Sequence, residues 1–152
     1  MHARGLRLSR RHKAWLYGSV GVLFVTGLVW WVLHDFMQVR TEFGTGPHPL
    51  ESWALKLHGL ASMISLVVLG TLLPLHVRRG WHSRRNRTSG SGLLGVMLLL
   101  TLSGYALYYT SHDSIRSLAS FGHKWIGLLL PVVISVHIWM GRRTSASVPP
   151  TS

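Results

Sequence analysis

The chain has 152 residues, of which 47% are hydrophobic and only 13% are charged. So few charged side chains cannot coat a water-soluble globule, which excludes an ordinary soluble domain. The sequence contains no cysteine, which excludes disulfides, iron–sulfur clusters, thiolate zinc sites and covalently attached c-type haem. Any metal or cofactor would therefore have to be bound by histidine.

Four long apolar runs predict four transmembrane helices. A helix needs about 20 mostly apolar residues to span a bilayer, and the runs cover residues 14–36, 53–77, 93–109 and 118–140. The first run is longer than a signal-peptide core and has no small-residue cleavage site, so we interpret it as a permanent helix. We expect an all-α, integral membrane four-helix bundle over residues 1–143, followed by a disordered tail over residues 144–152.

The net charge of +12 is distributed unevenly along the chain. Twelve basic residues precede the first run or follow the second and fourth runs: Arg4, Arg7, Arg10, Arg11, Lys13, Arg78, Arg79, Arg84, Arg85, Arg87, Arg142 and Arg143. The opposite helix ends carry only four basic residues and all four acids of the chain. The positive-inside rule then predicts cytoplasmic N and C termini in a multi-pass membrane protein. Anionic lipid head groups account for the basic loops, so nucleic acid is not an expected partner.

The loops fix the direction of each predicted helix. An outer loop of about fifteen residues, with two glycines and two prolines, separates the first two helices, and an inner loop over residues 78–92 ends in Ser-Gly repeats. In this interpretation Ser91 caps the third helix. Because the loops alternate between the two sides, the second and fourth helices run in the same direction.

Four of the ten histidines lie in or at the ends of these two parallel helices. His58 and His76 are 18 residues apart, or five whole turns at about 100° per residue, and His123 and His137 are 14 residues apart, about 40° short of four turns. Each pair therefore lies on one helix face, with one histidine near each membrane surface. Low-spin haem b takes two imidazoles from facing helices. The pattern predicts two haems, with ligand pairs His58–His123 and His76–His137.

The axial spacings of the two pairs differ. An ideal helix gives about 27 Å between His58 and His76 but only about 21 Å between His123 and His137. Tilt of the helix or a bend at Pro74 would reduce the difference. Otherwise His12, at the cytoplasmic end of the first helix, replaces His76 as a ligand.

Small residues one turn after the outer histidines would leave room for a porphyrin. They are Ser62 and Gly127, although small residues also serve plain packing between transmembrane helices. The main alternative to haem is that the intramembrane histidines form hydrogen bonds between helices, without any metal.

The segment FGHKWIGLLLPVVISVHIWMG, residues 121–141, resembles the last haem-binding helix of bacterial di-haem cytochromes b. These are the membrane subunits of formate dehydrogenases and nickel-iron hydrogenases. The resemblance implies that His123 and His137 are haem ligands and that the protein lies in the bacterial inner (cytoplasmic) membrane. The segment SRRHKAWLYG is a looser match to the first helix of that family, with His12 in the place of a ligand. The presence of both His58 and His76 in one helix is more similar to cytochrome b of the respiratory bc complexes.

Two haems stacked across the bilayer would form a transmembrane electron pathway, linking a quinone pool to a periplasmic cytochrome or other redox subunit. Arg116 is placed to neutralise a haem propionate. Enzymatic quinol oxidation or quinone reduction is an open possibility, with His34, Asp35 and Glu42 as candidate proton acceptors. The alternative, from a different functional class, is a haem-free membrane anchor or scaffold subunit of a redox complex.

Overall fold

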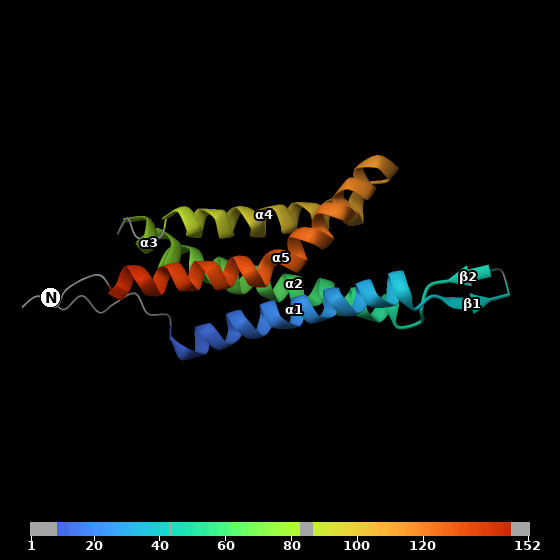
Figure 1. Cartoon of the computed structure of the whole chain (residues 1–152), viewed down its shortest axis with the longest axis horizontal. Coiled ribbons are helices and arrows are strands. Elements are labelled where there is room, and N and C mark those ends of the chain that lie inside the picture. Colours follow the sequence, from blue (N-terminus) through green and yellow to red (C-terminus); the bar gives the residue numbers. More distant parts are fainter. Residues whose placement is uncertain (1–8, 43, 83–86, 147–152) are drawn as a thin grey trace, which may run out of the picture. The chain divides into compact units, whose positions relative to one another are not determined.

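The computed structural model describes residues 9–42, 44–82 and 87–146, and four long helices account for most of them (Figure 1). They are α1 (Arg10–Phe36), α2 (Glu51–Leu72), α4 (Arg87–Tyr109) and α5 (Asp113–Ala146). A π-helical segment, Leu73–Val77, and the short helix α3 (Arg78–His82) follow α2. The prediction of four long helices is therefore confirmed. The chain divides into two compact units, Met1–His76 and Val77–Ser152, each of which contains one helical hairpin.

All four long helices have the length and composition of membrane spans. In the described part of the chain, the candidate spans are Arg10–Phe36, Glu51–Leu72, Arg87–Tyr109 and Asp113–Arg143. At most 11% of the residues in the apolar window of any of these helices are buried. Large apolar side chains such as Val67 and Leu98 point outward instead, being 69% and 58% exposed. An apolar exterior of this kind suits contact with lipid, so the chain is a multi-pass membrane protein.

The first unit is an antiparallel hairpin in which α1 packs against α2. The buried residues of the two helices are Ser19 and Leu33 of α1 and Ala54, Ala61 and Leu72 of α2, so small side chains lie among them. Without a hydrophobic driving force in lipid, transmembrane helices associate through such close contacts. The side chain of Ser9 caps α1 by accepting a hydrogen bond from the backbone N–H of His12 at 3.2 Å.

The predicted outer loop contains a short β-hairpin. Strands β1 (Val39–Thr41) and β2 (Gly44–Gly46) pair antiparallel, with Thr41 opposite Gly44. Gly44 has a φ of 115°, a conformation that glycine adopts without strain. The connection between α1 and α2 therefore contains a pair of strands, and Pro47 and Pro49, which follow β2, line the pocket described below.

The second unit is the hairpin of α4 and α5, and both helices begin earlier than the sequence predicts. α4 begins at Arg87 rather than at residue 93, so the prediction that Ser91 caps this helix is wrong. The Ser91 hydroxyl donates instead to the backbone carbonyl of Arg87 at 2.8 Å, one turn back inside the helix. The Ser-Gly repeats remain helical because backbone groups near a membrane must be satisfied within the helix. α5 begins at Asp113 rather than at residue 118.

The C-terminal end of α5 also differs from prediction. The helix continues to Ala146, so residues 144–146 are helical where a disordered tail was expected. The rest of that predicted tail, residues 147–152, lies outside the described residues. Pro131 lies inside α5, where the helix continues past it.

The predicted second helix, residues 53–77, is interrupted near its end. Regular α-helix stops at Leu72, and the π-helical turn Leu73–Val77 contains both Pro74 and His76. Proline has no N–H and its ring clashes with the carbonyl four residues earlier, which a wider turn relieves. At Pro74, where the sequence allows a bend, the structure has a local change of helix type.

Candidate functional site

His58 is held by the neighbouring helix of its own hairpin. Its Nδ1 lies 3.2 Å from the Thr26 hydroxyl and 3.0 Å from the Leu23 carbonyl, both on α1. The side chain is half-buried, and it projects from α2 into the α1 interface. The contacts therefore fix both the position of the ring and the direction of its Nδ1 edge.

The hydrogen-bond network assigns the tautomer of His58. The Thr26 hydroxyl has a single hydrogen, and its backbone acceptors are the Val22 carbonyl at 2.8 Å and the Leu23 carbonyl at 3.1 Å. The hydroxyl can therefore offer only a lone pair to His58, and the Leu23 carbonyl can only accept. Facing two acceptors, Nδ1 must carry the proton. A neutral imidazole with the proton on Nδ1 has its lone pair on Nε2, the nitrogen that can bind a metal.

His123 of α5 has an equivalent partner on α4. Its Nδ1 lies 2.9 Å from the Ser103 hydroxyl. That hydroxyl has Leu99 and Leu100 carbonyls of its own helix at 2.7 Å and 3.2 Å as acceptors for its hydrogen. Because these carbonyls can take the only hydrogen of the hydroxyl, Ser103 is placed to accept a hydrogen bond from Nδ1–H of His123, which would leave the lone pair on Nε2. One histidine in each hairpin therefore has its Nδ1 beside a hydroxyl that is also bonded to carbonyls of its own helix.

His137 makes a similar contact with a serine hydroxyl near the other end of the second hairpin. Its Nδ1 lies 3.1 Å from the Ser89 hydroxyl of α4. Ser89 and Ser103 are fourteen residues apart, as are His123 and His137. In an antiparallel hairpin this equal spacing places each serine beside one histidine. The histidine spacing that suggested two haems is thus matched by the spacing of the hydroxyl partners.

A glycine directly follows each of the three hydroxyl residues and lies against the imidazole. A Cβ atom added to Gly27 would lie only 2.9 Å from Cε1 of His58. The corresponding distances are 3.4 Å from Gly104 to His123 and 3.7 Å from Gly90 to His137. A larger residue at Gly27 would force the His58 ring to shift, whereas the other two contacts are close to ordinary van der Waals distances. We call each unit of hydroxyl residue, glycine and histidine a histidine clasp: Thr26–Gly27 with His58, Ser103–Gly104 with His123, and Ser89–Gly90 with His137.

The fourth predicted ligand, His76, lies in the π-helical turn and its side chain is exposed. The alternative ligand, His12, lies in the first turn of α1, where its Nδ1 is 3.3 Å from the Ser9 hydroxyl. Neither belongs to a histidine clasp among the described residues. The proposed pairs His58–His123 and His76–His137 each combine residues of both units, so the pairing stays a prediction.

The other predicted site residues have local roles. Ser62 is half-buried in α2 and its hydroxyl donates to the Gly59 carbonyl at 2.8 Å. Gly127 faces α4, since an added Cβ would lie 3.8 Å from Cδ2 of Leu100. Arg116 is exposed in the first turn of α5. Within its unit, Gly127 therefore supports helix packing, and space for a porphyrin beside Ser62 or Gly127 stays a prediction.

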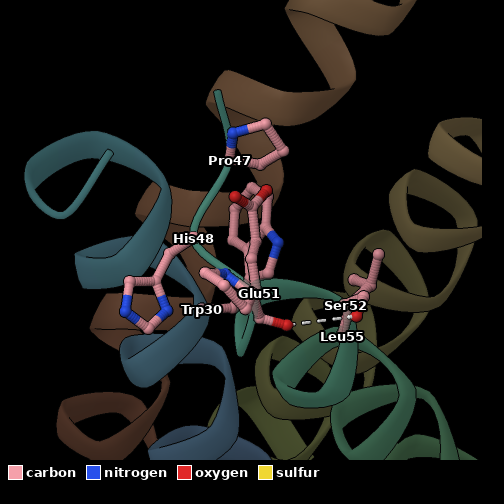
Figure 2. A pocket seen from close by; sticks show the side chains of 7 residues that line it. Trp30, Pro47, His48, Glu51, Ser52 and Leu55 are labelled. Carbon is pink, nitrogen blue, oxygen red and sulfur yellow. Dashed lines mark hydrogen bonds between the residues drawn. The ribbon is translucent and has the colours of Figure 1, made fainter. Parts of the chain in front are cut away.

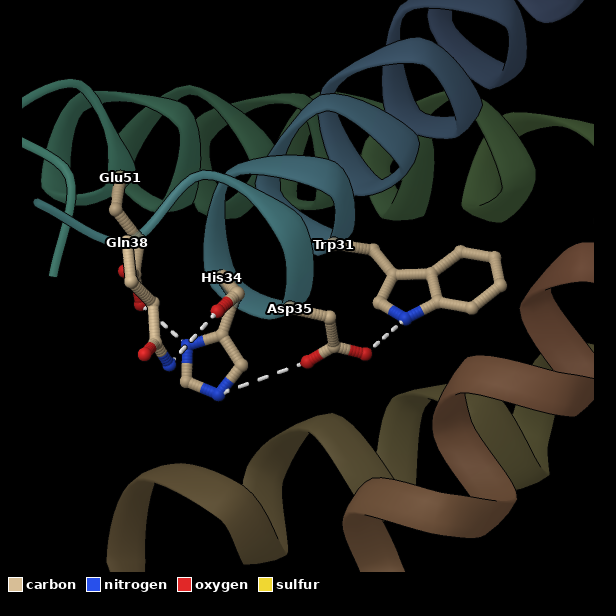
Figure 3. Close-up of polar contacts among 5 residues, drawn as sticks. All are labelled: Trp31, His34, Asp35, Gln38 and Glu51. Atoms are coloured by element: carbon tan, nitrogen blue, oxygen red, sulfur yellow. Dashed lines mark hydrogen bonds and ion pairs between the residues drawn. The ribbon is translucent and has the colours of Figure 1, made fainter.

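A second polar cluster joins α1 to α2 at the loop end of the first hairpin (Figure 3). His34 Nδ1 lies 2.8 Å from Oε1 of Glu51, and His34 Nε2 lies 4.0 Å from Oδ1 of Asp35. Asp35 also accepts a hydrogen bond from the Trp31 indole. The sequence had suggested Glu42 as the third member, but Glu42 lies in the exposed β-hairpin connection and Glu51 takes this place.

An open pocket of about 360 Å³ lies beside this cluster (Figure 2). The pocket is lined by Trp30, Pro47, His48, Pro49, Glu51, Ser52 and Leu55. The Trp30 ring stacks on His34 with centroids 4.8 Å apart, so both members of the His34–Glu51 pair adjoin the pocket. The second carboxylate oxygen of Glu51, Oε2, is buried and has no hydrogen-bond partner among the described residues. The arrangement is an aromatic and proline-lined pocket next to a carboxylate–imidazole pair.

The described residues contain no group of three or more His, Asp or Glu side chains able to hold a metal ion together. No known protein family, curated protein or solved structure matches the chain. The resemblance of the α5 segment to the di-haem cytochromes b therefore stays a prediction.

Proposed function

We propose that this protein is a b-type cytochrome that carries electrons across the membrane through two haems. In the proposal, His58 and His123 bind one haem, and His76 and His137 bind the other. The observation that carries it is the contact that His58 and His123 share, in which Nδ1 lies within 3.2 Å of a hydroxyl group on the adjacent helix that can accept its proton. Ligating histidines characteristically donate this second N–H to a nearby acceptor.

The donor set suits haem better than a bare metal ion. Haem iron needs only two axial ligands, because the porphyrin supplies the other four, and two imidazoles complete its coordination. A tetrahedral zinc or copper site needs three or four protein ligands close together. When bound, the haems would supply reversible one-electron exchange. The protein residues hold the imidazoles in one orientation, and the surrounding apolar helices exclude water.

The π-helical turn favours His76 as the fourth ligand. A wider turn contains more residues per turn and advances less per residue, so it shortens the axial distance between His58 and His76. That distance is about 27 Å for a regular helix, against about 21 Å for the other pair. The π-helical turn therefore makes the axial distance between His58 and His76 more similar to the distance between His123 and His137.

The proposal includes a cell location and partners. The distribution of basic residues supports cytoplasmic termini, and the resemblance to the di-haem cytochromes b supports a bacterial inner membrane. Arg116 would then lie near the outer surface as a partner for a haem propionate. Electrons would pass between a quinone pool and a periplasmic cytochrome or another redox subunit. The pocket beside His34 and Glu51 is a second reason to consider quinol chemistry, because quinol oxidation releases protons that such a pair could accept.

The deciding experiment is a reduced-minus-oxidised absorption spectrum of the purified full-length protein, with haem quantified as its pyridine complex. We expect two b-type haems per chain. His123→Ala and His58→Ala should each remove the same haem, and His137→Ala should remove the other. His82→Ala is a matched control, because this exposed histidine lies in α3 and its ring contacts the Arg78 carbonyl of its own helix. A colourless wild-type protein would refute the proposal and favour the haem-free scaffold.

A further inference from the structure

The three histidine clasps share a chemistry that the proposed function does not require by itself. In each clasp, a hydroxyl on the neighbouring helix lies within 3.2 Å of Nδ1, and the next residue is a glycine against Cε1. The contact occurs in both units, on different helices and with either threonine or serine. Ordinary helix packing does not need a hydroxyl and a glycine at each of these histidines.

Serine and threonine hydroxyls inside a helix commonly donate to the carbonyl four residues earlier, and Thr26 and Ser103 do so. This internal bond consumes the only hydrogen of the hydroxyl and turns its lone pair towards the next helix. The hydroxyl thereby becomes an acceptor for the neighbouring imidazole. At His58, where Nδ1 also faces the Leu23 carbonyl, the proton must then be on Nδ1.

Resting on the proposed function, we infer that Thr26, Ser103 and Ser89 are positioning residues for the haem ligands. Each hydroxyl accepts the Nδ1 proton of its histidine, fixes the ring plane and directs the Nε2 lone pair to iron. An imidazole that donates this hydrogen bond to the hydroxyl is a stronger electron donor to iron. The stronger donation stabilises ferric haem. The hydroxyl groups therefore set both the affinity for haem and its reduction potential.

The inference predicts which substitutions act together. Thr26 supports His58 and Ser103 supports His123, the two proposed ligands of one haem, whereas Ser89 supports a ligand of the other haem. Thr26→Ala and Ser103→Ala should therefore change the same spectral and redox component, and Ser89→Ala should change the second component. Losing a partner of this kind weakens binding of the cofactor by about 10- to 100-fold.

The test is a spectroelectrochemical titration of the full-length protein in lipid nanodiscs, combined with haem titration. We expect Ser103→Ala to raise the reduction potential of one haem and weaken its binding, and Ser103→Thr, which keeps the hydroxyl, to restore both. Ser91→Ala is the matched control, because Ser91 also precedes a glycine in α4 but is exposed and donates to its own helix.

The outcomes separate this inference from the proposed function. A wild-type protein without haem would refute both. Two haems in the wild type, with unchanged potentials and affinities in Thr26→Ala, Ser103→Ala and Ser89→Ala, would overturn the inference alone. Effects of Thr26→Ala and Ser103→Ala on different haems would overturn the assignment of their histidines to one haem. If an alanine variant fails to fold, ¹⁵N resonances of the histidine rings in the wild-type protein report the tautomer directly, and protonated Nε2 at His123 would contradict the inference.

Discussion

Oε1 of Glu51 lies 2.8 Å from Nδ1 of His34, which joins the first turn of α2 to the last turn of α1 across seventeen residues of sequence. Glu51 is the more enclosed partner, with 16% of its side chain exposed against 47% for His34. The pair borders the pocket that contains Trp30 and the two prolines of the connection (Figure 2). A carboxylate in this position can accept a proton from a hydroxyl compound in the pocket.

Glu51→Gln tests this role. If the pocket takes the head group of a quinol, the variant should reduce the rate of haem reduction by a soluble quinol about 100-fold or more, because the amide cannot accept the proton. The measurement is stopped-flow absorbance with decylubiquinol and menadiol. Glu42→Gln is the control, since Glu42 is exposed and does not line the pocket. Equal rates in the two variants, with haem content unchanged, would show that Glu51 takes no part in quinol oxidation.

Gly27→Ala should disturb His58 selectively. An added Cβ would lie 2.9 Å from Cε1 of the ring, so the imidazole must move away from α1 and lose its bonds to Thr26 and Leu23. Alanine normally stabilises a helix by about 1 kcal/mol relative to glycine, which acts in the opposite direction. We expect haem content to fall from two to one per chain.

Gly21→Ala is the control for this substitution. Gly21 lies in the same helix, and nothing lies within 4 Å of its added Cβ. Its haem content should match the wild type, with equal or greater thermal stability. A Gly27→Ala protein with two haems and unchanged spectra would show that the close contact with His58 is unimportant.

The number of helices was predictable from the sequence, but their ends were not. Four apolar runs specify four spans because the thickness of the bilayer sets a minimum length. The residues 87–92 are rich in serine and glycine and predict a loop, yet they form the first turns of α4, where Ser91 bonds within the helix. The preference of serine and glycine for loops is a weak guide here, because backbone groups near a membrane have few hydrogen-bond partners outside a helix.

The histidines were identified by spacing, but their partners were not. Thr26, Ser89 and Ser103 are common residue types in transmembrane helices and give no signal individually. The equal fourteen-residue spacings of the Ser-Gly and histidine pairs in α4 and α5 could have indicated the contact. Glu51 was missed for a different reason. The path of the chain through Pro47 and Pro49 places Glu51 beside His34, and that path cannot be read from the sequence.

Ala61→Leu should weaken the first hairpin. Ala61 is only 4% exposed, among the buried residues of the hairpin, so a larger side chain would force α1 away from α2. Overpacking of this kind destabilises a protein by about 1–3 kcal/mol. The measurement is the midpoint of thermal unfolding in detergent, which should fall. Val67→Leu introduces the same residue on the outward face, where Val67 is 69% exposed, and should leave the midpoint unchanged. A similar midpoint for both variants would mean that α1 and α2 do not depend on close contact.

His76→Ala and His12→Ala decide the fourth ligand. The π-helical turn around Pro74 shortens the path from His58 to His76, which favours His76, so we expect His76→Ala to lose the haem that His137→Ala also loses. His12→Ala should retain both haems. It should also retain the N-cap of α1, because the Ser9 hydroxyl accepts a hydrogen bond from the backbone N–H of residue 12, which the substitution leaves in place. Haem content and the two reduction potentials are measured in each variant. Loss of one haem in His12→Ala, with both retained in His76→Ala, would reverse the assignment and imply that the change of helix type at Pro74 serves packing instead of ligand placement.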